Sequence, residues 1–156
     1  MSDSLLQSHS GTPAHSQVIS AEITLHWLYD GQIIVYAVDT PTMTHGLVDT
    51  LLEVITQTMQ NWNPNRPYLA LQNLQIGTML QPALIAHTRR QADRMLEAVG
   101  PNVYGRVATV LPVHHTSSMF RLWLEREAQH RQPALAHRLM ADEQQALNWL
   151  VDGLPH

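Results

Sequence analysis

Imidazole and hydroxyl side chains lie next to one another in the stretch LPVHHTSSMFRLWLER, residues 111–126. His114 and His115 are followed closely by Ser117 and Ser118. A histidine beside a serine can act as the base for a nucleophilic hydroxyl, and histidines are also common metal ligands. The stretch therefore raises two chemical hypotheses, a nucleophilic active site and a metal site. A third hypothesis is that the hydroxyls only begin a helix after a strand.

The spacing favours the third hypothesis. Side chains alternate along a strand, so His114 and His115 would not share one metal ion without a turn between them. The sequence contains neither a Gly-x-Ser-x-Gly nucleophile elbow nor a His-x-x-x-His helix motif. Ser117 or Ser118 is instead a typical N-cap for the helix that follows. We therefore expect no catalytic residue, metal or cofactor, and an enzyme with His114 or His115 as its base remains an alternative.

Composition predicts one domain and excludes several classes of protein. The chain has 156 residues, of which 44% are hydrophobic, and it has no cysteine, which excludes disulfides and thiol catalysis. All nine basic residues are arginines, the formal net charge is −4, and no basic run occurs, so nucleic acid is not an expected partner. No apolar run approaches the roughly 18 residues that cross a membrane. The N-terminus also lacks the pattern of a secretory signal, so we expect a cytoplasmic protein.

Hydrophobic periodicity predicts strands that alternate with helices. Residues 1–19 are rich in Ser, His and Gln, which predicts a flexible tail in front of one domain over residues 20–156. Strands are predicted at residues 23–29, 32–39, 68–74, 105–112 and 136–140. Helices are predicted from about residues 40 to 59, 78 to 99, 117 to 132 and 142 to 152. The order β-β-α-β-α-β-α-β-α predicts an α/β fold, a mixed sheet of about five strands covered by about four helices.

Turn and capping residues mark the limits of these elements. Asp30-Gly31 predicts a hairpin turn, and the strand after it is apolar on both faces, which is typical of a strand inside a sheet. Thr40-Pro41, Thr78 and Asp142 each have the residue type of a helix N-cap. A glutamine follows Thr78 and Asp142 after three residues, at Gln81 and Gln145. Both pairs therefore have the spacing of a capping box. If Thr78 is a cap, Thr78→Ala should lower stability by about 1 kcal/mol.

The element order and three stretches resemble the STAS and SpoIIAA-like family, which includes anti-sigma-factor antagonists and other small regulatory modules. The stretches are DGQIIVYAVD (30–39), LALQNLQIGTMLQPAL (69–84) and HRLMADEQQALNWL (137–150), within a resemblance that covers about residues 21–152. The resemblance implies a single STAS-like domain and a non-enzymatic regulatory or protein-interaction module. In anti-sigma antagonists the loop after the third strand carries an Asp-Ser pair, and the Ser is phosphorylated by a partner kinase. Here the loop has no Asp-Ser pair, and Thr78 is the hydroxyl that the resemblance implies as the phosphorylation site.

A second functional hypothesis comes from the sheet itself. Ligands of open parallel sheets bind beyond the carboxyl ends of the strands, where three predicted loops meet. Helix N-termini at this edge favour an anion. The alternative function is therefore a small-ligand or anion-binding domain that uses this edge. Its predicted ligand-binding residues are Thr78, His114, His115, Ser117, Ser118 and Asp142.

Charged side chains also concentrate on the predicted second helix. Arg89, Arg90 and Arg94 lie there with Asp93 and Glu97. They form either a solvated face with weak ion pairs or a patch for an acidic protein partner. The expected partners are thus another protein, a second copy of the chain, or a small anion.

Overall fold

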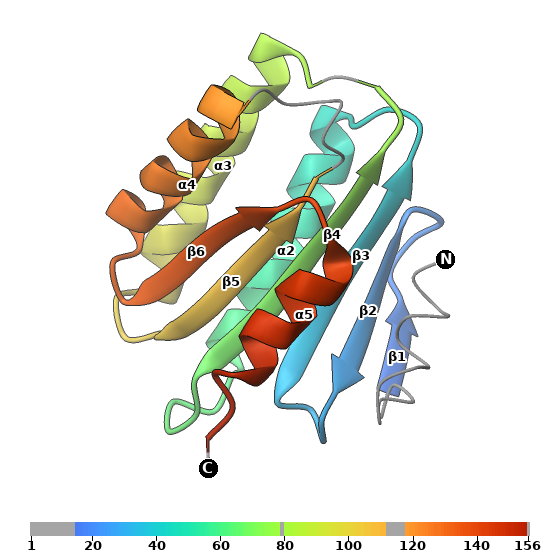
Figure 1. Ribbon diagram of the computed structural model, residues 1–156. Helices are drawn as coiled ribbons and strands as arrows, with labels where there is room; N and C mark the ends of the chain where they lie inside the picture. The colour runs from blue at the N-terminus through green and yellow to red at the C-terminus, as the bar shows by residue number, and fades with distance from the viewer. Residues whose placement is uncertain (1–14, 79, 112–117, 156) are drawn as a thin grey trace.

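The computed structural model describes residues 15–78, 80–111 and 118–155, without the side chains of residues 118–124. This part of the chain forms an α/β fold (Figure 1). Its six strands are β1 (His15–Val18), β2 (Ile23–Leu28), β3 (Ile33–Thr40), β4 (Tyr68–Ile76), β5 (Gly105–Val110) and β6 (Leu135–Met140). Its four helices are α2 (His45–Gln60), α3 (Pro82–Val99), α4 (Ser118–Arg131) and α5 (Glu143–Val151). The α/β class and the four helices are confirmed, whereas the prediction of five strands is wrong by one.

The strands lie in the sheet in the same order as in the chain, from β1 to β6. The pairs β1–β2 and β2–β3 are antiparallel, and β3, β4, β5 and β6 are parallel to one another. The parallel register aligns Ile33 with Leu69 and Tyr68 with Gly105. The mixed sheet with a parallel portion is therefore confirmed.

The strand that the sequence analysis missed is β1, which lies within the residues assigned to the tail. It pairs with β2, and His15 lies opposite Trp27. All four β1 residues are exposed. The strand is therefore held mainly by its backbone hydrogen bonds, and hydrophobic periodicity could not reveal it.

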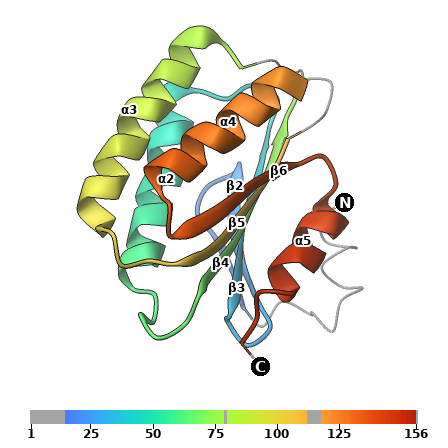
Figure 2. The ribbon, with the colours of Figure 1, turned by 60° about the vertical axis from the view of Figure 1, so that its left-hand side comes forward.

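Helices cover both faces of the sheet. Figure 2 shows α2, α3 and α4 on one side of the sheet and α5 on the other. The connections between parallel strands are right-handed as a rule, which places successive crossover helices on one face. The last helix, α5, follows the last strand and is free to cover the opposite face.

Each face of the sheet has its own apolar core, and β3 contributes to both. Ile34, Tyr36 and Val38 belong to the core that α2 covers. Ile33 and Val35 belong to the core that α5 covers. The prediction that this strand lies inside the sheet with both faces buried is confirmed.

The first helix begins later than predicted. Thr40 belongs to β3, and its hydroxyl donates a hydrogen bond to the carbonyl of Thr42 at 2.9 Å. The N-cap is Thr44, whose hydroxyl accepts from the backbone N–H of Leu47 at 3.2 Å. Thr40-Pro41 therefore ends a strand and does not begin a helix.

Thr78 does not cap a helix, so that prediction is also wrong. A Cβ on the preceding Gly77 would lie 2.9 Å from the carbonyl oxygen of Pro41, because the two loops pass close together here. Helix α3 begins at Pro82, after Gln81. Proline is favoured at the first position of a helix, which explains this start. The predicted cap of the last helix is confirmed, because Asp142 Oδ1 accepts from the backbone N–H of Gln144 at 2.8 Å.

These two positions give a direct test of the helix starts. We expect Asp142→Ala to lower the free energy of unfolding by about 1 kcal/mol, since it removes the acceptor at the N-terminus of α5. Thr78→Ala should change it by less than about 0.5 kcal/mol, because the side chain is exposed. Urea denaturation measures both. Asp142→Asn keeps the acceptor and is the matched control. A larger loss in Thr78→Ala than in Asp142→Ala would contradict the assignment.

Candidate functional site

The carboxyl ends of the parallel strands form the edge at which the sequence placed a site. Thr78 is exposed in the loop after β4, and Asp142 is exposed at the start of α5, which follows β6. Ser118 is the first residue of α4, but its side chain is outside the described residues. His114, His115 and Ser117 are also outside the described residues. The topology thus brings Thr78, the start of α4 and Asp142 to one edge, and the role of the histidine pair stays a hypothesis.

The part of this edge next to α5 is acidic and partly buried. Burial raises the pKa of Glu143, a hydrogen bond with Asn73 opposes this shift, and the charge of Asp142 adds to it. Asn73 is buried at 1% exposure, and its Oδ1 accepts from Gln75 Nε2 at 2.7 Å. Asp142 already occupies the N-terminus of α5 as a cap. Two carboxyl groups at this helix end do not favour the binding of an anion there.

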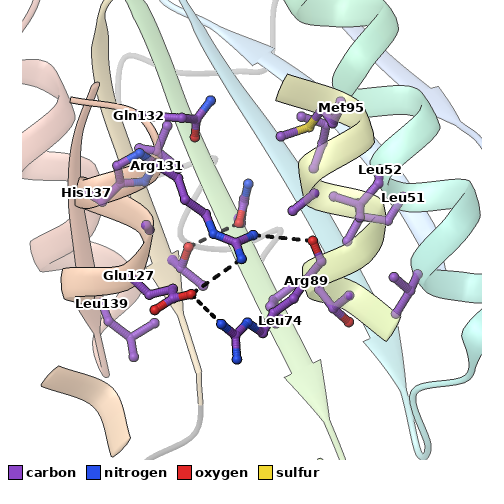
Figure 3. Close-up of a pocket in the computed structure, with 18 of the residues that line it drawn as sticks. Leu51, Leu52, Leu74, Arg89, Met95, Glu127, Arg131, Gln132, His137 and Leu139 are labelled. Carbon is purple, nitrogen blue, oxygen red and sulfur yellow. Dashed lines mark hydrogen bonds and ion pairs between the residues drawn. The ribbon is translucent and has the colours of Figure 1, made fainter. Parts of the chain in front are cut away.

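A cavity lies on the face of the sheet opposite to α5, between the sheet and the helices α2, α3 and α4. Its volume is about 310 Å³, and most of its wall is apolar (Figure 3). The wall includes Leu51, Leu52, Ile55, Leu74, Leu84, Ile85, Met95, Leu96 and Val107. Leu84 is the only buried residue of α3, while Ile85, Met95 and Leu96 are half-buried. The apolar side chains of α3 thus face a space that they do not fill.

The helix α4 closes one side of this cavity because it is attached to the edge strand β6. The backbone N–H of His137 donates to Gln129 Oε1 at 3.1 Å, and that of Leu139 donates to Glu125 Oε2 at 3.1 Å. These two N–H groups lie on the side of β6 that has no neighbouring strand. Side chains of α4 therefore accept hydrogen bonds from backbone N–H groups of the edge strand β6, and these bonds hold α4 next to the cavity.

Four charged residues join α3 to α4 across the cavity; we call them the ion-pair cluster. They are Arg89 and Asp93 of α3 and Glu127 and Arg131 of α4. Figure 3 shows three of them, Arg89, Glu127 and Arg131. The distances are 2.7 Å from Arg89 Nη2 to Glu127 Oε1, 2.9 Å from Arg131 Nη1 to Asp93 Oδ1, and 3.4 Å from Arg131 Nη2 to Glu127 Oε1. Arg89, Glu127 and Arg131 are also part of the cavity wall. Arg89 and Asp93 were predicted to belong to a solvated face or to a patch for an acidic partner. In the structure both form ion pairs with residues of α4.

Polar side chains of β4, β5 and β6 also line the cavity. Thr109 Oγ1 donates to Gln72 Oε1 at 3.1 Å, which pairs these two side chains across β4 and β5. His137 of β6 also lines the cavity, and its Nε2 is buried without a hydrogen-bond partner in the described part of the chain. Burial lowers the pKa of His137 to about 4, so the ring is neutral near pH 7. A buried ring nitrogen without a hydrogen-bond partner is available to form a hydrogen bond with a bound molecule.

A second cluster of polar side chains ties α2 to α3 on the surface. The rings of His45 and His87 stack with centroids 4.3 Å apart, and His87 Nε2 lies 2.7 Å from Asp49 Oδ1. Gln91 Nε2 donates to the same oxygen at 2.7 Å. Hydrogen bonds from Gln91 and His87 lower the pKa of Asp49. The cluster joins two helices, and it explains how α3 is held when few of its residues reach the sheet.

Sequence reasoning missed the cavity, His137 and the ion-pair cluster. His137 lies in a predicted short strand, and no motif separates it from the other histidines. Among the described residues, no group of three or more His, Cys, Asp or Glu side chains could hold a metal ion. No described helix has both the length and the apolar character that a membrane span requires. Comparisons of the chain with protein-family models, with curated proteins and with solved structures find no match.

Proposed function

We propose that the protein is a non-enzymatic regulatory module of the STAS/SpoIIAA-like type, which acts by binding another protein at the carboxyl edge of its sheet. The observation that carries the proposal is the order of the elements from β2 onward, β-β-α-β-α-β-α-β-α. This is the order on which the resemblance to that family rests. The three stretches that carry the resemblance form the β2–β3 hairpin region, β4 with its following loop, and β6 with α5.

The exposed loop after β4 supports this edge as the contact surface. Loops that a rigid sheet holds in place are common positions for binding residues. Gly77 and Thr78 are both exposed there, and Asp142 is exposed two strands away. The proposed binding does not require phosphorylation. Thr78 is accessible to a kinase, but it precedes α3 by several residues and does not open the helix as the family's serine does.

Site-specific cross-linking tests the proposal. A photoreactive amino acid is placed at Thr78 and, as the matched control, at Asn102, which is exposed in the loop that enters β5 at the opposite edge of the sheet. We expect a defined adduct with one protein from position 78 and none from position 102. The captured protein, once purified, should bind the wild type and bind a Thr78→Arg variant at least about tenfold more weakly.

The control position gives the experiment its negative outcome. Equal adducts from both positions would mean nonspecific contact and would contradict the proposal. Absence of any adduct from position 78 in cells that express the protein would contradict it as well.

A further inference from the structure

The cavity beneath α2, α3 and α4 has the size of a ligand site. Its volume is about 310 Å³, at the lower end of the range of about 300–1,000 Å³ for small-molecule pockets. An apolar cavity of about 150 Å³ accommodates benzene. By that scale the space accepts one molecule of about a dozen non-hydrogen atoms.

The wall predicts an apolar occupant. Water needs two to four polar partners in a buried site, and most of the surface of this wall is apolar. The described side chains leave this space unfilled and lack packing contacts there, which is unusual in protein interiors. A hydrocarbon chain would restore those contacts along Leu52, Leu74 and Met95, which Figure 3 shows around the same space.

The polar groups on the wall restrict the head group of that molecule. Arg89 and Arg131 are already paired with the carboxylates of Glu127 and Asp93, so an anionic ligand would have to displace one of these carboxylates. His137 Nε2 is buried without a partner among the described residues. A neutral hydroxyl satisfies the ring nitrogen without burying a charge, whereas a carboxylate does not.

The ion-pair cluster is the point at which such a molecule can enter. It spans the gap between α3 and α4, and Arg89 and Asp93 are 46% and 58% exposed. Exposed ion pairs are weak, and they can open without unfolding the sheet. The cavity is partly open to solvent, and weak, exposed ion pairs form part of its wall.

We propose that this cavity binds a neutral, mostly apolar small molecule, an aliphatic alcohol of medium chain length, with its hydroxyl hydrogen-bonded to His137. The chain lies between the sheet and α3, and the hydroxyl points to β6. This site is on the face of the sheet that α2, α3 and α4 cover, and it is independent of the protein-binding edge proposed above.

Calorimetric and NMR titrations with 1-octanol test this proposal, with octanoate as the comparison ligand. We expect saturable binding of 1-octanol, with backbone shift changes in α3 and β6, and binding of octanoate at least about tenfold weaker at pH 7.5, because a charged head must be desolvated. His137→Leu should weaken the binding of 1-octanol by about tenfold through the loss of one hydrogen bond.

Two variants fill the cavity and control for binding elsewhere. Ala92 of α3 is half-buried in the cavity wall, so Ala92→Phe should abolish the binding of 1-octanol. Ala92→Leu fills less space and should weaken the binding of 1-octanol. This variant replaces Ala92→Phe as the test if the phenylalanine prevents folding. Undiminished binding in a folded Ala92 variant overturns the proposal, and so does tighter binding of octanoate than of 1-octanol. Absence of saturable binding by the wild type overturns it too.

Discussion

Replacement of Gly105 with alanine should lower the free energy of unfolding by about 4 kcal/mol, the largest effect that we expect from one substitution. Gly105 is the first residue of β5 and has a φ of +140°, which L side chains rarely adopt. A Cβ at this position would lie 2.1 Å from the carbonyl oxygen of Tyr68 and 2.7 Å from its nitrogen. Both atoms belong to the backbone of β4, so neither can move aside as a flexible side chain would. The start of β4 and β5 would have to separate.

Gly100 offers the matched control for this substitution. Its φ is +82°, and a Cβ there would have no atom within 4 Å. Gly100→Ala therefore carries only the cost of a backbone conformation that is almost exclusive to glycine, about 1–3 kcal/mol. Urea denaturation of both variants separates this backbone cost from the steric overlap at Gly105. Equal losses of stability in the two variants would mean that β4 and β5 tolerate a side chain at position 105.

The half-buried ring of His137 should make the protein less stable in mild acid. The pKa of this ring is about 4 in the folded protein, against about 6.5 in the unfolded chain. Between these values the unfolded chain binds more protons than the folded protein, so stability falls as the pH falls. The contribution of the neutral His137 ring to the free energy of unfolding is fully present above about pH 6.5 and is lost progressively towards pH 4. From pH 7.5 to pH 5 the loss amounts to about 2 kcal/mol.

Urea denaturation at pH 7.5 and pH 5 measures this loss, and His137→Leu is the variant that should remove it. The variant keeps every carboxyl group of the wild type, including Glu125 and Glu127, which also line the cavity. The difference between the two proteins therefore reports the ring alone. A variant that loses as much stability between these pH values as the wild type would show that His137 becomes protonated as readily when folded as when unfolded.

The sequence was informative where burial decides the structure. The apolar faces of β3 and the confirmed cap at Asp142 follow from local residue types, which act within a few positions of the chain. The helix starts were harder because Thr40, Thr44 and Thr78 all have the residue type of a cap. Thr40 pairs with β4 and belongs to the sheet, so the N-cap of α2 is Thr44. Such a choice depends on a strand that lies far away in the sequence.

The cavity could not be predicted for a related reason. Helical spacing correctly indicates which residues of α3 face inward, but it contains no information on how far the helix stands from the sheet. That distance depends on contacts between remote residues, such as Arg89 with Glu127 and His87 with Asp49. The unpaired nitrogen of His137 likewise results from the positions of β5, β6 and α4 together.

The order of strands in the sheet has a consequence for how the chain folds during synthesis. Each strand pairs only with the strands next to it in the chain, although a crossover helix separates the two strands of each parallel pair. A nascent chain can therefore add one strand at a time as it leaves the ribosome. Helix α5 follows β6 in the chain and covers Leu69, Leu71 and Ala108. Until α5 emerges, the ribosome-bound intermediate presents this apolar face, and it is there that a chaperone would recognise the incomplete protein.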